Sequence, residues 1–230
     1  MDLLPDSSGL CLGPMNSTEL AQAHWNNTPL YRSEEERYSG YPWLYEAAEF
    51  RDHAGERILE IGCGSGCDLL QFAKNGAIAT GVDVTERHLE LARGRVGGLA
   101  VVQYGSACQL PFVDGSFDYV YSHGVIHHID TPKTAVQEML RVLRSGGRFN
   151  VHVYALWSES TAIYLLKHGR DWKRHVENST DPVHIQLYTV RTLRRLFAPI
   201  ALDISKHQSY HLPALSRWTG FFMVAKGRKP

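Results

Sequence analysis

The stretch Ile58-Leu59-Glu60-Ile61-Gly62-Cys63-Gly64-Ser65-Gly66 joins an apolar strand pattern to a series of alternating glycines. Glycine lets the backbone approach a ligand closely, because no side chain intervenes. A helix pattern follows over residues 67–74, and the start of a helix presents free N–H groups and the positive end of the helix dipole. The stretch therefore predicts a strand, a ligand-binding loop and a helix.

Strand and helix patterns continue to alternate beyond this loop. We expect strands over residues 57–61, 77–82, 100–104, 119–122 and 147–153, and helices over 67–74, 86–95 and 132–143. This alternation is typical of a parallel sheet with right-handed crossovers and helices on both faces. The sequence therefore predicts an α/β, doubly wound fold with a mostly parallel sheet.

Segments of other kinds flank this core, which we place at residues 54–155. Ser33 followed by acidic residues signals a helix start, and Leu44, Ala47 and Ala48 share one helical face. We expect one domain over residues 1–230, because the 230-residue chain can bury an ordinary core. Its other expected parts are a loose tail (1–17), a helical, aromatic-rich lid (18–53), a helical insertion (156–197) and closing strands (198–230).

The composition excludes several classes of partner. Lys and Arg balance Asp and Glu at 24 each, so no overall positive field gathers nucleic acid. Neither a signal sequence nor the roughly 20-residue apolar run of a membrane span is seen, and a cytoplasmic protein without membrane partners is expected. The cysteines lack metal-ligand spacing, so we expect no metal and reduced thiols at Cys11, Cys63, Cys67 and Cys108.

Asp83 indicates which kind of ligand the loop binds. It ends the next predicted strand, about 20 residues beyond the loop, where a carboxylate accepts hydrogen bonds from both ribose hydroxyls. Cys67 stands where the dinucleotide fingerprint has its third glycine, which disfavours a nicotinamide-dependent oxidoreductase. The two residues together indicate a nucleoside, and a helix cap at Asp83 with a plain glycine turn is the alternative.

These motifs resemble the class I S-adenosylmethionine-dependent methyltransferase family. The resemblance spans residues 38–154 and includes Gly81-Val82-Asp83, Leu110-Pro111-Phe112, Val125-Ile126-His127-His128 and the segment 141–147. It implies a seven-stranded sheet, S-adenosylmethionine as cofactor and S-adenosylhomocysteine as product. The function expected is methyl transfer to an O, N or C atom of a small molecule, in specialised metabolism. A non-catalytic nucleoside-binding regulatory module is the alternative.

The resemblance also assigns roles to loop residues. It implies that Glu60 orders the loop and the methionine end, that Asp83 holds the ribose, and that Ser106 and Ala107 face the adenine. The family usually carries Asp at the place of Ser106, and an uncharged hydroxyl makes that bond about 1 kcal/mol weaker. The cofactor-binding residues expected are Glu60, Gly62, Cys63, Gly64, Gly66, Asp83, Val84, Ser106, Ala107, Ser122 and His123.

Histidines follow the fourth and fifth predicted strands. Residues 121–130 align without gaps with a serine, glycine and glutamate-histidine pattern of cyclopropane fatty acid synthase-like methyltransferases. His127 takes the place of their glutamate, and His152 matches a histidine after their fifth strand. Imidazole titrates near pH 6.5, so His127, His152 and His123 are the catalytic candidates. Packed histidines that cap a loop are the alternative.

Aromatic and basic residues of the chain indicate which kind of acceptor molecule to expect. The lid aromatics suit stacking on a flat substrate or cation–π contact with the sulfonium. We expect substrate contacts from Tyr38, Tyr41, Trp25, Tyr154 and His128. A basic run in the insertion fits an acidic group on the acceptor, or alternatively a solvated helix face; it comprises Lys167, Arg170, Lys173 and Arg174.

Overall fold

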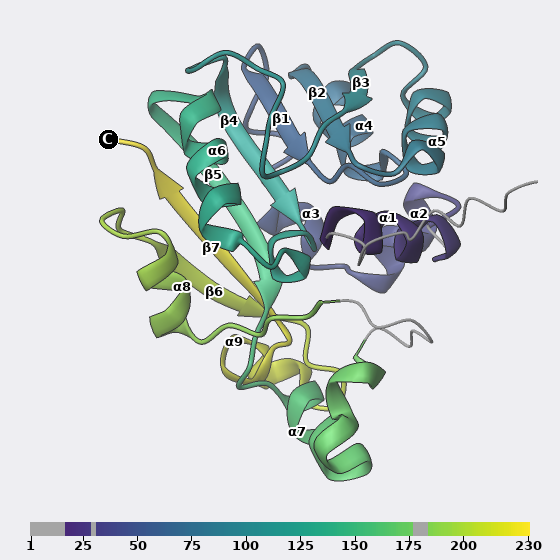
Figure 1. Ribbon diagram of the computed structural model, residues 1–230, viewed down its shortest axis with the longest axis vertical. Helices are drawn as coiled ribbons and strands as arrows, with labels where there is room; N and C mark the ends of the chain where they lie inside the picture. The colour runs from purple at the N-terminus through teal and green to yellow at the C-terminus, as the bar shows by residue number, and fades with distance from the viewer. Residues whose placement is uncertain (1–16, 29–30, 177–183) are drawn as a thin grey trace, which may run out of the picture.

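A seven-stranded sheet forms the centre of the computed structural model, which describes residues 17–28, 31–176 and 184–230. The strand order is β3-β2-β1-β4-β5-β7-β6 (Figure 1). Pairing is parallel from β3 to β5, and β7 runs antiparallel to both β5 and β6. The strands are β1 (Arg57–Ile61), β2 (Ile78–Asp83), β3 (Val101–Tyr104), β4 (Phe117–His123), β5 (Leu143–Tyr154), β6 (Asp203–His207) and β7 (Phe222–Arg228). This confirms the predicted doubly wound, mostly parallel sheet. The predicted closing strands are β6 and β7, and they pair antiparallel.

Helices precede, connect and follow the strands as the patterns indicate. They are α1 (Ser17–Asn27), α2 (Glu34–Gly40), α3 (Leu44–Ala47), α4 (Cys67–Lys74), α5 (Glu86–Val96), α6 (Pro132–Val142), α7 (Glu159–His168), α8 (Val190–Leu196) and α9 (Ser216–Thr219), with 3-10 turns η1 (Ile126–His128), η2 (Gly169–His175) and η3 (Pro213–Leu215). Within the described ranges, no helix has both the length and the hydrophobicity needed to cross a bilayer. Apart from Ser17, the predicted tail lies outside the described residues.

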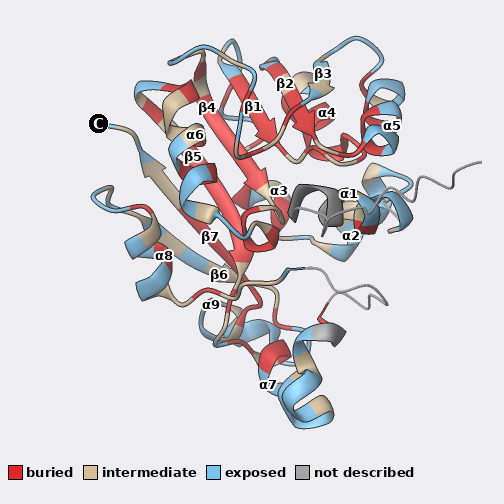
Figure 2. Cartoon of the chain, in the orientation of Figure 1, coloured by how far each residue is buried: buried red, intermediate tan, exposed pale blue. Residues whose placement is uncertain are grey.

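The alternation of side chains along β1 shows how the two faces of the sheet are covered. Ile58 packs in one apolar cluster with residues of α3, α4 and α5. Leu59 and Ile61 point to the opposite face and pack with residues of α6 and α8. Figure 2 shows the central strands buried along most of their length. The core is therefore two apolar layers separated by the sheet, as a doubly wound fold requires.

The start of β5 differs from the prediction. Gly146 and Gly147 suggested a break before a strand at residues 147–153, but β5 begins at Leu143. Neighbouring strands extend it: Phe117 pairs with Leu143, and Lys229 exchanges backbone hydrogen bonds with Gly146 (3.0 Å) and Gly147 (2.9 Å). Partners far along the chain therefore override the local glycine signal.

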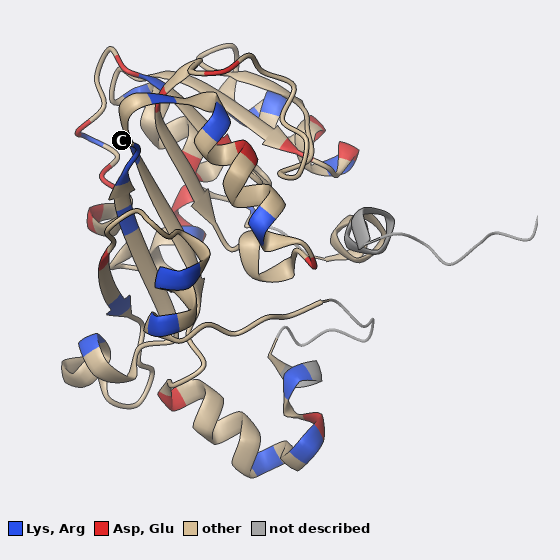
Figure 3. Cartoon of the chain, turned by 60° about the vertical axis from the view of Figure 1, so that its left-hand side comes forward, with Lys and Arg blue, Asp and Glu red and all other residues tan. Residues whose placement is uncertain are grey.

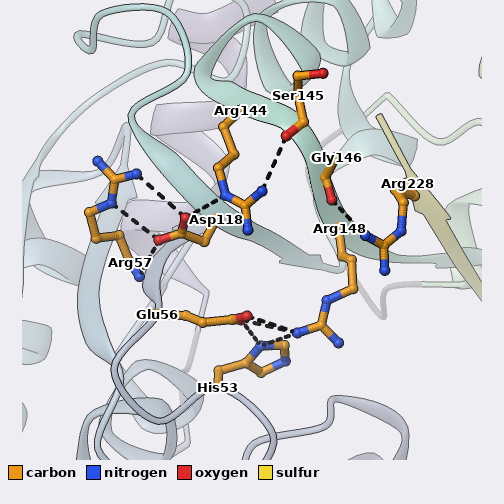
Figure 4. Close-up of polar contacts among 9 residues, drawn as sticks. All are labelled: His53, Glu56, Arg57, Asp118, Arg144, Ser145, Gly146, Arg148 and Arg228. Carbon is orange, nitrogen blue, oxygen red and sulfur yellow. Dashed lines mark hydrogen bonds and ion pairs between the residues drawn. The ribbon is translucent and has the colours of Figure 1, made fainter. Parts of the chain in front are cut away.

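Ion pairs join the amino ends of β1, β4 and β5, at the end of the sheet remote from the glycine loop (Figure 4). The Asp118 carboxylate accepts hydrogen bonds from Arg57 Nε (3.1 Å) and Arg144 Nε (2.6 Å). A second group pairs Glu56 with Arg148 (3.1 Å) and with His53 Nδ1 (2.7 Å). These contacts fix the ends of three strands, of which β1 lies far from β4 and β5 in the chain.

Asp118 should make the stability of the fold depend on pH. Burial alone raises its pKa, but hydrogen bonds from Arg57 and Arg144 outweigh burial and lower the pKa to about 2. The unfolded value is about 3.9, so the stabilisation is present above about pH 4 and is lost as the pH falls toward 2. We expect Asp118→Asn to lower the free energy of unfolding at pH 7 by up to about 1 kcal/mol, measured by urea denaturation.

The difference from the unmodified protein should then shrink between about pH 4 and 2. Asp114→Asn is the control, because the Asp114 side chain is 80% exposed. A deficit of the same size at pH 2 would contradict the role given to the Asp118 carboxylate.

Candidate functional site

A cavity of about 450 Å³ lies at the carboxyl ends of the parallel strands, and residues of α1 and α2 also line it. Figure 1 shows α1 and α2 at this end of the sheet. Its size is in the range of small-ligand sites. The segments that line it are the glycine loop after β1, the end of β2, residues 105–108 after β3, residues 123–125 after β4, and the N-terminal residues Trp25, Arg37 and Tyr41. The ends of the parallel strands and the N-terminal helices therefore meet at this cavity.

The glycines of the loop have distinct functions. Gly62, Gly64 and Gly66 all adopt left-handed backbone conformations, with φ of 73°, 52° and 78°, which glycine adopts without strain. A Cβ on Gly62 would overlap the Val125 side chain, and one on Gly66 would press against Ala92 of α5. Gly64 faces open space instead, so Gly64 is the glycine that leaves room for a ligand.

Asp83 is bound to the loop as well as to its own turn. Its Oδ2 accepts a hydrogen bond from the Gly64 N–H (2.9 Å), and its Oδ1 accepts one from the Thr85 N–H (2.9 Å). His88 lies 3.4 Å from Oδ1 and connects it to the Trp25 carbonyl (3.1 Å). Thr85 is the residue at the N-cap of α5. Since a carboxylate has about four acceptor positions, Asp83 retains capacity for ligand hydroxyls.

Asp68, in the first turn of α4, is a buried carboxylate with partners from several elements. It accepts hydrogen bonds from Arg37 Nε (2.6 Å), Tyr38 Oη (2.9 Å) and Tyr121 Oη (3.0 Å), and Arg37 Nη2 makes a second contact. It is 2% exposed. Neither Arg37 nor Asp68 is among the residues predicted from the sequence, although an acidic residue inside the apolar pattern of α4 indicates that Asp68 needs a partner.

Glu60 lines the same cavity, but one oxygen of its carboxyl group, Oε2, has no hydrogen-bond partner among the described residues. The residue is 3% exposed. The pKa of Glu60 is held well above the ordinary value. The main cause is burial and the second is the negative charge of Asp68, while the positive charge of Arg37 acts in the opposite direction. A cationic group of a ligand would supply the partner that this carboxyl group lacks.

The three candidate histidines occupy different positions. His123, at the end of β4, lines the cavity. His152 lies behind it, is fully buried, and has its Nδ1 2.8 Å from His123 Nδ1. His127 is fully buried, packs against Tyr154 at 3.8 Å between ring centroids, and has no partner on either ring nitrogen among the described residues. Burial lowers the pKa of all three well below 6.5.

Most of the predicted site residues come together at this cavity. Those that line it are Glu60, Gly62, Cys63, Gly64, Asp83, Val84, Ser106, Ala107, His123, Trp25, Tyr41, Tyr154 and His128. Those that do not are Gly66, Ser122, Tyr38, His127 and His152. Ser122 instead donates a hydrogen bond to the Ile61 carbonyl (3.2 Å), and Tyr38 binds Asp68. Ser122 and Tyr38 therefore bind residues that line the cavity without lining it themselves.

A second cavity, of about 400 Å³, adjoins the first. Tyr41, Tyr154 and Phe222 line both cavities and form the boundary between them. Its other lining residues include Tyr164, Tyr210, Phe221 and Lys167. No Asp or Glu is among the described residues that line it. The second cavity therefore suits an aromatic or apolar group, with a positive charge at one side.

Residues 59–151 match the model of a family described as a methyltransferase domain. The chain is 36% identical over 110 residues to the O-methyltransferase resE of Aspergillus sclerotiorum, and this match covers 45% of the chain and 42% of the relative. It is 30% identical over 194 residues to the uncharacterized methyltransferase YcgJ of Bacillus subtilis, covering 81% of the chain and 73% of the relative. The chain thus spans less than half of resE and most of YcgJ.

The fold is also similar to that of solved structures. A crystal structure of an S-adenosylmethionine-dependent methyltransferase from Thermotoga maritima, described as a possible histamine N-methyltransferase, superposes with a TM-score of 0.66. It is 22% identical in sequence, and the match covers 94% of this chain and 100% of that one. At this identity, the similarity shows a common fold.

Substitution of Asp83 should weaken ligand binding. Asp83→Ala removes the carboxylate that holds Gly64 in the loop and, with it, the remaining acceptor capacity for ligand hydroxyls. We expect S-adenosylhomocysteine to bind more weakly by about 1.5 to 3 kcal/mol, measured by titration calorimetry. Asp203→Ala, at an exposed position on β6, is the control. Unchanged affinity in Asp83→Ala would place the nucleoside elsewhere.

Proposed function

Because the chain belongs to the class I S-adenosylmethionine-dependent methyltransferase family, with S-adenosylmethionine as its cofactor, we propose that it methylates a small molecule. One observation carries this proposal. A nucleoside-sized cavity with the Asp83 carboxylate at one side and the His123 imidazole at another adjoins a second, aromatic cavity. Cofactor and acceptor would then bind on either side of the boundary formed by Tyr41, Tyr154 and Phe222.

The residues of the first cavity fit the cofactor. We assign the ribose to Asp83, the adenine to Ser106 and Ala107, and the ammonium end to Glu60, whose Oε2 lacks a partner. When bound, S-adenosylmethionine supplies a methyl group on a positively charged sulfur. Glu36, Glu60, Asp68 and Asp83 line the cavity, and Arg37 is the Lys or Arg among its described lining residues. This excess of acidic groups favours a cationic ligand over the product that has lost the sulfonium charge.

The second cavity supports an acceptor with an aromatic body and an anionic group. Its aromatic side chains offer stacking surface, and Lys167 of α7 provides a cation at its edge. Figure 3 marks Lys and Arg positions in blue at the end of α7 and in the turn that follows it, where Lys167, Arg170 and Lys173 are exposed. The side chain of Arg174 lies outside the described residues. A carboxylate on the acceptor would have a partner in this region.

His123 is the residue that we propose takes a proton from the acceptor. It lines the cofactor cavity near Tyr41 and Phe222, which also line the second cavity. A neutral imidazole accepts the proton that a hydroxyl loses when its oxygen is methylated. We therefore favour an oxygen acceptor, which agrees with the description of resE as an O-methyltransferase. A specialised metabolite is the class of acceptor we propose.

Product analysis tests this function. The purified protein is incubated with S-adenosylmethionine and phenols that carry a carboxylate, next to uncharged phenols of the same size. We expect S-adenosylhomocysteine and a methyl ether by mass spectrometry, with the anionic phenols preferred. Cofactor binding without S-adenosylhomocysteine formation across broad metabolite classes would favour the non-catalytic binding module instead.

His123 should affect turnover more than cofactor affinity. For His123→Gln we expect kcat to fall by about 100-fold, the usual effect of losing a general base, while the Kd of S-adenosylhomocysteine changes little. His184→Gln, at an exposed position, is the control. Equal losses in kcat and affinity would make His123 a structural residue.

The pH profile gives an independent check on His123. Burial, and next to it the charge of Arg37, lowers the pKa of His123 well below 6.5. The base form therefore persists as the pH falls through 6.5. We expect kcat/KM to stay level between about pH 8 and 6.5 and to decline only at lower pH, whereas half-loss at pH 6.5 would indicate an unperturbed imidazole.

A further inference from the structure

A chain of buried polar side chains leads away from His123 into the protein. His123 and His152 are paired in register on the parallel strands β4 and β5, and their Nδ1 atoms are 2.8 Å apart. His152 Nε2 lies 3.0 Å from Asn150 Oδ1, and Asn150 Nδ2 donates to the Ala47 carbonyl at 2.7 Å. Asn150 and His152 are both fully buried.

The inner end of this chain fixes its direction. The Ala47 carbonyl can only accept, so the NH₂ of Asn150 lies on that side and its carbonyl oxygen faces His152. His152 must then donate from Nε2 to Asn150. A neutral imidazole carries a single N–H, so His152 Nδ1 is left with a lone pair that faces His123.

The neutral state of His152 follows from its surroundings. Burial is the main cause of its lowered pKa, the charges of His123, His207 and Lys226 add to the effect, and Asp68 opposes it. Its ring lies against Tyr121 and Trp43, at 5.3 and 5.7 Å between centroids. No carboxylate contacts either ring nitrogen among the described residues, so nothing close by would hold a second proton.

We infer that the chain Ala47–Asn150–His152 sets the tautomer of His123, with the proton on Nδ1 and the lone pair on Nε2. Asn150 and His152 are thus positioning residues for the proton acceptor. The inference rests on the proposed function of His123. His123 Nε2 has no hydrogen-bond partner among the described residues and is not enclosed, so it is the ring nitrogen available to an acceptor hydroxyl.

This arrangement needs no movement when the proton arrives. The acceptor O–H bond breaks and its proton joins His123 Nε2, while the Nδ1–H continues to donate to His152 and becomes a stronger, charge-assisted donor. The proton stays on His123, because the chain ends at a carbonyl that has no proton to pass on. Phe222 stacks on His123 at 5.1 Å and Trp43 lies at 6.1 Å, within reach for cation–π stabilisation of the imidazolium.

The tautomers can be measured without an acceptor. Long-range ¹H–¹⁵N NMR spectra of protein labelled at histidine distinguish a protonated ring nitrogen from a bare one, and signals are assigned by their loss in His123→Gln and His152→Gln. We expect His123 to carry its proton on Nδ1 and His152 to carry its proton on Nε2. A proton on His123 Nε2, or two protons on His152, would overturn the inference.

A variant tests the consequence for turnover. Asn150→Leu removes the group that orients His152, so the His123 signals should shift toward a mixture of tautomers and kcat should fall by about 100-fold. The Kd of S-adenosylhomocysteine should stay within about twofold. Asn75→Leu, at the end of α4, is the control. Full activity with an unchanged His123 spectrum would contradict the inference.

The outcomes separate this inference from the function on which it rests. If no acceptor is methylated but the tautomers are as expected, the function of His123 is wrong and its hydrogen-bonding chain is right. If methylation occurs and the tautomers are reversed, only the chain is wrong. If Asn150→Leu does not fold, the spectrum of the unmodified protein still decides the matter.

Discussion

The site depends on the ion pair and the hydrogen bonds that the buried Asp68 carboxylate makes. Asp68 lies in the first turn of α4, and its partners are Arg37 and Tyr38 of α2 and Tyr121 of β4. One buried charge therefore binds α2 to the helix after the glycine loop and to the central sheet. A buried ion pair of this kind is costly to break, because either partner alone would be left uncompensated. The N-terminal helices are consequently held where Arg37 and Tyr41 line the proposed cofactor cavity.

The sheet provides the second constraint. Parallel strands end at a common edge, so residues far apart in the chain meet there: Glu60 from β1, Asp83 from β2 and His123 from β4 all reach one cavity. The same geometry places His152 of β5 directly beside His123. Charge is divided between the two sides of the site, since carboxylates surround the proposed cofactor position while Lys167 lies in the neighbouring cavity.

Local patterns in the sequence predicted the fold, and most of the residues predicted for the site line one cavity. The strand that ends at Ile61, the glycine loop and Asp83 are contiguous motifs whose chemistry depends on near neighbours. Roles that depend on contacts across the chain were not predicted. Arg37 and Asp68 are 31 positions apart, and nothing local to either shows that they pair.

The histidines illustrate the same limit within one motif. His123 and His127 follow the same strand, and the sequence ranks them by resemblance alone. In the structure, the 3-10 turn η1 buries His127 completely, whereas His123 ends β4 at the cavity. Asn150 was not predicted, because an amide two positions before a histidine in a strand gives no local sign of a functional contact. Its importance follows from the Ala47 carbonyl, which belongs to a different element.

A crystal structure of the protein with S-adenosylhomocysteine would show directly which residues bind the nucleoside. We expect the ribose hydroxyls to bind Asp83, the ammonium group to lie at Glu60, and the sulfur to face the boundary of Tyr41, Tyr154 and Phe222. Binding of the nucleoside away from Asp83, or with its sulfur directed away from the second cavity, would contradict this expectation.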